Sequence, residues 1–182
     1  MCPKSRGVPV PTTSYVDAFH ASNKTTRRSH TGFTIFLNLA PIIWYRKNKN
    51  TVEASTFSSE FIATKACIEH ITSLRFKLRM FVVPVLVSTK ILCDNESAVT
   101  NSSILAPTQN KKHISIAYHY VIYNVASNQV IVSWIGTNYN LADAFTKRLT
   151  YKKDIVCLLI GLINIKFIIN IHNLMRPGKY YH

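Results

Sequence analysis

The chain has 182 residues, with 22 Lys and Arg against only 8 Asp and Glu, and a formal net charge of +14. This length suits one domain with flanking tails, and an apolar content of 47% is enough to bury a core. The charge favours a nucleic-acid partner. The four Cys show no C-x-x-C spacing, which argues against a zinc knuckle and a disulfide framework; Cys67 and Cys93 are expected to be small core residues in a reducing compartment.

Both ends of the chain differ from its centre. Residues 1–13 contain three Pro and no apolar run, so they are not a signal peptide and are expected to be irregular. Residues 151–182 form an apolar tail, in which 155–171 read IVCLLIGLINIKFIINI. That stretch is shorter than the roughly 20 apolar residues of a membrane span and is interrupted by Lys166, so a buried helix or strand is favoured over a membrane segment. The folded domain is therefore predicted at 14–150.

The first half of this domain predicts three strands and a long helix. Strand-forming residues occupy 14–18, 33–37 and 41–45, and the turns between them are short, which indicates an antiparallel meander. Residues 58–79 contain no Pro or Gly and are predicted to be a helix. Its apolar stripe consists of Ala63, Cys67, Ile71, Leu74 and Leu78.

Extended backwards, this stripe includes Glu60. A carboxylate on the face that packs against a sheet is costly unless a bound cation compensates it. The alternative is that Glu60 points to solvent and supports the helix N-terminus, with Ser58 or Ser59 as the cap.

The second half continues with a strand at 87–93, a helix from 96, a helix at 111–126, a strand at 130–135 and a last helix at 140–148. Asp94 follows the first of these strands, and either Asp94 or Asn95 could cap the helix after it. Asn140 is predicted to cap the last helix, which places Asp143 at its third position as a partner of the helix dipole.

This order of elements predicts an α/β domain with a mixed five-stranded sheet, three antiparallel strands followed by two further strands, flanked by helices. Asp17 and Asp94 end strands, whereas Glu60 and Asp143 begin helices. Because the carboxyl ends of central strands form the functional edge of such a sheet, one edge can hold all four acids.

Five motifs in this order resemble the ribonuclease H domain of copia-type LTR retrotransposon polyproteins over roughly residues 14–149. They are YVDA at 15–18, SSEF at 58–61, ILCDNESAV at 91–99, KKHISIAYHYV at 111–121 and NLADAFTK at 140–147. The resemblance implies a ribonuclease H-like fold and hydrolysis of the RNA strand of an RNA–DNA hybrid. It also implies a neighbouring reverse transcriptase domain in the polyprotein and a cytoplasmic, virus-like-particle location, with the nucleus as the alternative.

Carried over by position, the resemblance makes Asp17, Glu60, Asp94 and Asp143 the catalytic, metal-binding carboxylates. They would hold two Mg²⁺ ions, with Mn²⁺ as an alternative, because oxygen ligands suit these cations better than zinc. Contacts to the hybrid backbone are expected from basic residues. These are Arg27, Arg28, Lys47, Lys49, Lys111 and Lys112.

Several departures keep other readings open. The segment after Asp17 reads FHASN where the family has Ala-Gly-Asp, Ser58 replaces a common Glu, and the tail is unusually apolar. Residues 136–139 lack the His that some enzymes of this fold carry there; His113 and His119 are expected on a helix surface. The alternatives are a catalytically inactive, nucleic-acid-binding remnant, or a non-functional relic whose apolar tail drives aggregation. The sequence gives no oligomeric state.

Overall fold

The computed structural model describes residues 7–23, 25–50, 52–53, 55–103 and 115–147. The predicted order of strands and helices is confirmed. The elements are β1 (Thr12–Phe19), β2 (His30–Leu37), β3 (Ala40–Asn48), α1 (Thr56–Met80), β4 (Thr89–Cys93), α2 (Glu96–Ser103), α3 (Ser115–Ala126), β5 (Val130–Trp134), the 3-10 helix η2 (Thr137–Tyr139) and α4 (Asp143–Thr146). The apolar stretch 155–171 lies outside the described residues.

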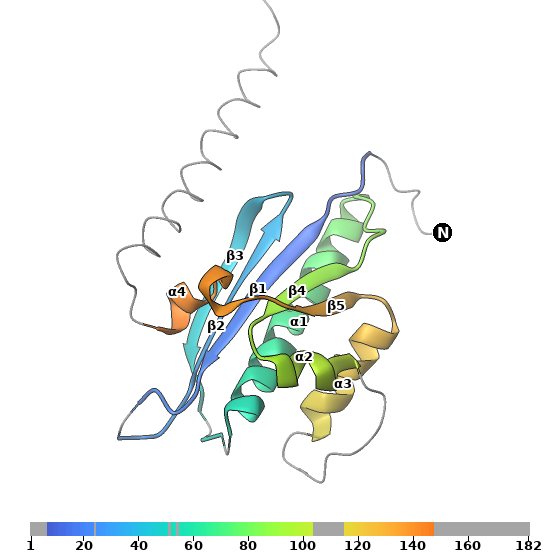
Figure 1. The fold of residues 1–182 in the computed structure, drawn as a ribbon. Coiled ribbons are helices and arrows are strands. Elements are labelled where there is room, and N and C mark those ends of the chain that lie inside the picture. The colour runs from blue at the N-terminus through green and yellow to red at the C-terminus, as the bar shows by residue number, and fades with distance from the viewer. Residues whose placement is uncertain (1–6, 24, 51, 54, 104–114, 148–182) are drawn as a thin grey trace, which may run out of the picture.

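The five strands form one mixed sheet in the order β3-β2-β1-β4-β5 (Figure 1). β1, β2 and β3 are antiparallel, as the short turns predicted, whereas β4 runs parallel to β1 and β5 runs parallel to β4. The predicted ribonuclease H-like sheet is therefore confirmed. Because β1 and β4 are adjacent and parallel, their carboxyl ends lie at the same end of the sheet.

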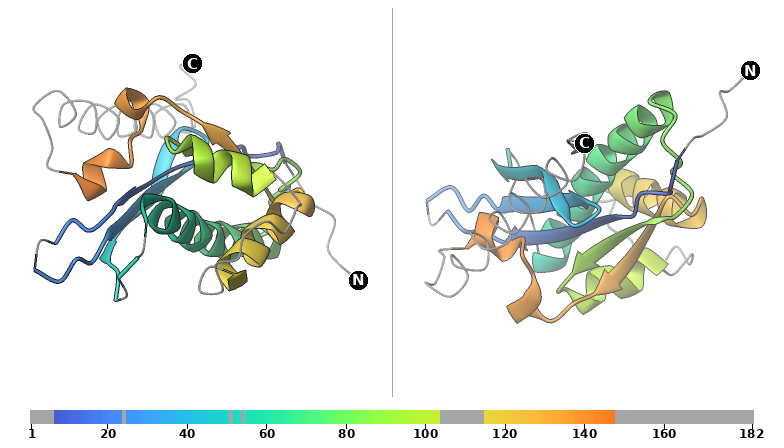
Figure 2. Two further views of the ribbon diagram at one scale, coloured as in Figure 1. Left: turned by 60° about the horizontal axis from the view of Figure 1, so that its bottom comes forward. Right: turned by 90° about the horizontal axis from the view of Figure 1, so that it is seen from above.

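The long helix α1 covers one face of the sheet, where it packs mainly on β1 and β2 (Figures 1 and 2). Alternate strand residues such as Val16, Phe33 and Ile35 are fully buried under it. The predicted stripe of α1 is confirmed at its centre, where Ala63, Cys67 and Ile71 are also fully buried. Each Å² of apolar surface removed from water contributes about 25 cal/mol to the free energy of unfolding, so this layer contributes strongly to the stability of the fold.

The start of α1 differs from the prediction. The helix begins at Thr56, and Ser55 is its N-cap because the Ser55 hydroxyl accepts a hydrogen bond from the Ser58 backbone N–H at 3.2 Å. Ser58 and Ser59 are therefore not caps. Both lie inside the helix and are fully buried.

The last helix also differs. α4 begins at Asp143, which is its first residue rather than its third, and Asn140 does not cap it. The Asn140 amide instead donates to the Val16 carbonyl at 3.0 Å, and its Oδ1 accepts from the Ala142 backbone N–H at 3.1 Å. Asn140 thus fastens the segment before α4 to β1, so the chain turns there and the helix starts later.

α4 lies across the other face of the sheet from α1 (Figure 2, left). Its approach depends on Gly32, which pairs with Asp17 in the β1–β2 ladder. A Cβ at Gly32 would stand 2.6 Å from the Thr146 side chain and 2.9 Å from Phe145 Cβ. The missing side chain therefore allows α4 to pack directly on the sheet beside Asp17.

Within the residues that the structure describes, no helix is long and apolar enough to cross a membrane.

We predict that Gly32→Ala destabilises the fold by about 1–3 kcal/mol, because the added methyl group overpacks the contact between β2 and α4. Gly136→Ala is the matched control, since a Cβ there meets only ordinary contacts, the first at 3.5 Å from Tyr139. Urea unfolding of both variants measures the difference. Equal stabilities would contradict the close approach of α4.

Candidate active site

The carboxyl ends of β1 and β4 place two acids side by side. Val16 pairs with Cys93 in the parallel ladder, so Asp17 and Asp94 are the next residues along the two strands. Asp143 reaches the same place from the start of α4. Carboxylate oxygens of Asp17, Asp94 and Asp143 lie within 4.8 Å of one another, and Asp17 and Asp143 are buried.

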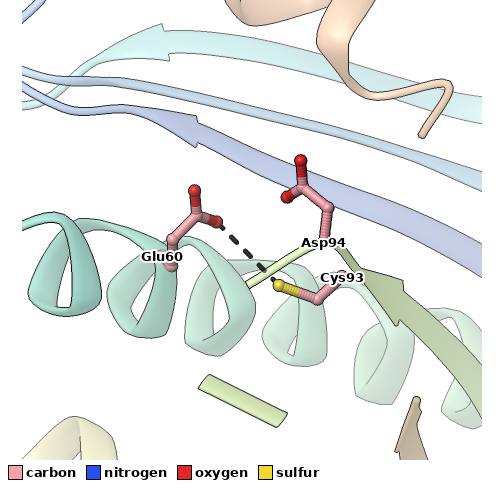
Figure 3. Close-up of side chains that lie close together, drawn as sticks. All are labelled: Glu60, Cys93 and Asp94. Carbon is pink, nitrogen blue, oxygen red and sulfur yellow. Dashed lines mark hydrogen bonds between the residues drawn. The ribbon is translucent and has the colours of Figure 1, made fainter. Parts of the chain in front are cut away.

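Glu60 joins this group from α1. Its side chain is buried, and its carboxylate lies with Cys93 and Asp94 in a second set of ligand atoms within 4.8 Å of one another. Figure 3 shows Glu60 and Asp94 directed into the same space, with Cys93 Sγ 4.0 Å from Glu60 Oε2. The reading in which Glu60 points to solvent is therefore wrong, and Asp94 links the two sets.

Glu60 reaches this position because β4 is shorter than β1. β4 ends at Cys93, whereas β1 continues to Phe19, so the edge of β1 beyond Val16 has no pairing from β4. The backbone N–H of Ala18 in this uncovered stretch donates to the Glu60 carboxylate. The Glu60 carboxylate thus accepts a hydrogen bond from β1 at a position where β4 no longer pairs with it.

The cap of α2 leaves Asp94 available. Asn95, not Asp94, caps this helix, because its Oδ1 accepts a hydrogen bond from the Ala98 backbone N–H at 3.0 Å. Of the two caps that the sequence left open, Asp94 and Asn95, the structure selects Asn95.

Two further residues of α4 and its end contact the acids. The Thr146 hydroxyl donates to Asp17 Oδ2, and the Lys147 ammonium lies 2.9 Å from Asp143 Oδ1 and 3.8 Å from Asp17 Oδ1. Neither residue was predicted from the sequence to have a role. The spacing of Asp143 and Lys147, four positions apart, was the available signal for the second of them.

Burial and mutual repulsion make these acids hard to ionise. Burial raises the pKa of Asp17 to about 6, against the opposing effects of Thr146 and Lys147. Burial, with the charges of Asp17 and Asp94, raises the pKa of Glu60 to about 9. Although burial opposes it, the hydrogen bond to Asp143 and the charge of Asp17 raise the pKa of Lys147. Lys147 therefore stays charged at neutral pH, and its single charge compensates Asp17 and Asp143 only in part.

The residues fit a divalent cation. Their donors are carboxylate oxygens, which Mg²⁺ and Mn²⁺ prefer, and the acids are held close together despite their repulsion. A bound divalent ion would supply positive charge and so favour the ionised form of the buried acids. All four predicted acids are thus brought together, and their oxygens could hold such an ion.

The predicted nucleic-acid contacts separate into three groups. Arg27, Arg28 and Lys47 are exposed at the end of the sheet that carries the acids. Lys49 does not fit the prediction, because it is buried and its ammonium donates to the Ser59 carbonyl at 2.7 Å. Burial lowers the pKa of Lys49 to about 8. Lys111 and Lys112 lie outside the described residues.

Among the described residues, His20 is a histidine near the acids that the sequence did not single out. It follows the end of β1, three residues after Asp17, and its Nδ1 lies 2.8 Å from Ser59 Oγ. His119 is exposed on α3, as predicted, and His113 lies outside the described residues. Cys67 and Cys93 are buried, free thiols, which also agrees with the prediction.

Curated proteins similar to this chain are retrotransposon polyproteins. The chain is 31% identical over 144 residues to the retrovirus-related Pol polyprotein from transposon TNT 1-94 of Nicotiana tabacum, a match that covers 79% of this chain and 11% of the relative. It is 31% identical over 142 residues to that from transposon RE1 of Arabidopsis thaliana, which covers 75% of this chain and 9% of the relative. The chain is related to the Pol polyproteins of copia-type retrotransposons. It spans about a tenth of the length of these Pol polyproteins. No family model matches the chain.

Solved structures show the same fold. The N-terminal ribonuclease H domain of a Mycobacterium tuberculosis protein, fused to maltose-binding protein, superposes with a TM-score of 0.57 at 12% identity, covering 75% of this chain and 91% of that one. LC11-RNase H1 in complex with an RNA/DNA hybrid gives 0.56 at 12% identity, covering 74% and 93%. The predicted family resemblance and ribonuclease H fold are therefore confirmed.

We predict that Glu60→Gln stabilises the metal-free protein at high pH. The folded-state pKa of Glu60, about 9, lies above its ordinary value of 4.5, so its contribution to stability is complete below about pH 4.5 and is lost as the pH rises towards 9. The neutral amide avoids this loss, and a gain of about 1–3 kcal/mol is expected near pH 9.

Thermal and urea unfolding between about pH 5 and pH 9, in a chelator, measure this effect against wild type. Added Mg²⁺ should remove the advantage of the variant, because only the wild-type carboxylate binds the cation. Parallel pH profiles for the two chains would contradict a buried, destabilised Glu60.

Proposed function

We propose that this chain hydrolyses the RNA strand of RNA–DNA hybrids as the ribonuclease H domain of a Pol polyprotein, with two Mg²⁺ ions, or Mn²⁺, as cofactors. The observation that carries the proposal is the convergence of Asp17, Glu60, Asp94 and Asp143, from four separate elements, at one end of the sheet. The relatedness to Pol polyproteins supports the polyprotein context and a neighbouring reverse transcriptase domain.

In this proposal the four acids hold the cations. When bound, paired divalent ions supply the activation of the attacking water and the charge stabilisation of the leaving oxygen. Asp17 and Asp143 would then contact the cations in place of the Lys147 ammonium. The 38% exposure of the Lys147 side chain leaves it room to turn towards solvent.

Substrate binding is assigned to the basic side chains beside the acids. Arg27 and Arg28 lie in the loop between β1 and β2, and Lys47 lies near the end of β3, where it pairs with Thr31. They are exposed and flank the end of the sheet at which Asp17 lies. Guanidinium and ammonium groups there would contact phosphates, which fixes the position of the duplex without reading its sequence.

One observation favours a second candidate, a catalytically inactive nucleic-acid-binding domain. The Lys147 ammonium already contacts Asp17 and Asp143, so a positive charge of the chain itself can compensate two of the four acids. If this contact is retained, the domain would bind hybrids through its basic loop without cleaving them.

We predict that Asp94→Asn lowers Mg²⁺-dependent cleavage of a hybrid by at least about 100-fold, beyond the 10–100-fold loss usual for residues outside the first ligand layer. The matched control is Glu96→Gln, because Glu96 is an exposed acid two residues further on, in the first turn of α2. It should cleave within about twofold of wild type, apart from a small loss of helix-dipole stabilisation.

The assay follows release of labelled RNA fragments by the 182-residue chain in Mg²⁺, in Mn²⁺ and in EDTA. Cleavage that survives EDTA or the Asp94→Asn change would reject the metal-dependent nuclease. Salt-sensitive binding without cleavage in either metal would select the inactive binding domain.

We predict that Arg28→Ala weakens hybrid binding similarly for all sequences and reduces the slope of log affinity against log salt by about 1. Lys77→Ala is the control, because Lys77 lies in the last turn of α1, far along the helix from Glu60. Titrations at several salt concentrations in the Asp94→Asn background measure binding alone. An unchanged salt slope would remove Arg28 from the interface.

A further inference from the structure

Ser59, the residue directly before Glu60, is held by three side chains from other parts of the chain. Its hydroxyl lies 2.8 Å from His20 Nδ1 and 3.2 Å from Ser29 Oγ. Its backbone carbonyl accepts a hydrogen bond from Lys49 Nζ at 2.7 Å. We call Ser59, His20, Ser29 and Lys49 the Ser59 cluster.

The three partners come from consecutive strands. His20 follows β1, Ser29 precedes β2 and Lys49 follows β3, so three strand ends converge on one residue of α1. The partners are also joined to one another. The Ala21 backbone N–H donates to Ser29 Oγ at 3.1 Å, and the Lys49 backbone N–H donates to the Ser29 carbonyl at 2.8 Å. The cluster therefore connects the first turns of α1 to the end of the sheet that carries Asp17.

The start of the helix does not need this arrangement. Ser55 already caps α1, and a helical carbonyl has the amide four residues later as its ordinary partner. Yet Lys49 is buried to donate a further bond to the Ser59 carbonyl, with Glu53 3.9 Å from its ammonium. Burying an ammonium group is costly, and capping of the helix does not require this contact.

The contact can be explained by the position of Glu60, the residue that follows Ser59. Its carboxylate lies in one set of ligand atoms with Asp94, within 4.8 Å of one another, and to bind a cation it must stay there although ionised carboxylates repel one another. A helix that is free to shift would relieve the repulsion by moving Glu60 away. The three contacts to the adjacent residue, Ser59, would oppose that movement.

We propose that the Ser59 cluster is a set of positioning residues that holds the Glu60 carboxylate at the proposed cation site. None of the four is a ligand or touches the reacting atoms; they act through the backbone of α1. The inference rests on the proposed function. Outer partners of metal ligands typically contribute 10–100-fold in metal affinity or activity, so removal of one contact should weaken Mg²⁺ binding about tenfold.

The experiment compares variants of the 182-residue chain by the rise in thermal unfolding temperature during a Mg²⁺ titration, which does not depend on cleavage. Ser59→Ala removes the hydroxyl contacts and keeps the carbonyl, and Lys49→Met removes the ammonium with little change in length. Each should raise the midpoint Mg²⁺ concentration about tenfold. Lys65→Met is the control, because Lys65 lies on the same helix and pairs with Glu69 on the surface; its midpoint should stay within about twofold of wild type.

A second pair of variants keeps the test decisive if Lys49→Met does not fold. His20→Ala removes a half-buried ring and its bond to Ser59, whereas the side-chain amide of His20→Asn can restore that bond. His20→Ala should raise the midpoint, and His20→Asn should return it to within about twofold of wild type. A merely structural role would lower the unfolding temperature of the variants without moving their Mg²⁺ midpoints, and that result would overturn the inference.

The outcome for the cluster is separable from that for the nuclease. If wild type binds Mg²⁺ and the variants bind it more weakly, the inference stands even when no hybrid is cleaved. If wild type cleaves and the variants keep its Mg²⁺ midpoint, the proposed function stands and the inference falls. If wild type gains no stability from Mg²⁺, the inference is overturned whether or not hybrids bind.

Discussion

The structure depends on keeping mutually repelling carboxylates, most of them buried, together at one end of the sheet. This protein has only eight acidic residues, and four of them lie at one end of the sheet. Such a group is unfavourable unless positive charge or hydrogen-bond donors compensate it. The raised pKa of Glu60, the Ala18 N–H on its carboxylate and the Lys147 ammonium between Asp17 and Asp143 are all consequences of that one constraint.

The fold meets the constraint by bringing backbone ends together. The parallel pairing of β1 with β4 puts Asp17 beside Asp94, and the early end of β4 opens the edge of β1 to Glu60. On the opposite face, Gly32 lets α4 approach closely enough for Asp143 and Thr146 to reach Asp17. The four acids therefore meet at one end of the sheet, where α1 contributes Glu60 from one face and α4 contributes Asp143 from the other.

The basic residues near the four acids differ in their burial and contacts. Arg27, Arg28 and Lys47 remain in solvent, where they can meet phosphates, whereas Lys49 and Lys147 are drawn towards the acids and the helix that carries Glu60. In the proposed function, the net charge of +14 would serve two purposes. Exposed cations attract a polyanion over distance, and partly or fully buried ones stabilise particular atoms of the fold.

Periodicity and motif order are properties of neighbouring residues, so they were sufficient to predict the order of the elements, the class of sheet and the buried stripe at Ala63, Cys67 and Ile71, and to single out the four acids as candidates. The folded chain was needed to show that Ser55 is the cap of α1, that Glu60 points inward, that Lys49 is buried, and that His20, Thr146 and Lys147 lie beside the site. A local pattern assigns a residue to one face of its element. Its charge balance and hydrogen bonds are set by atoms from distant segments, and folding alone brings those segments within reach.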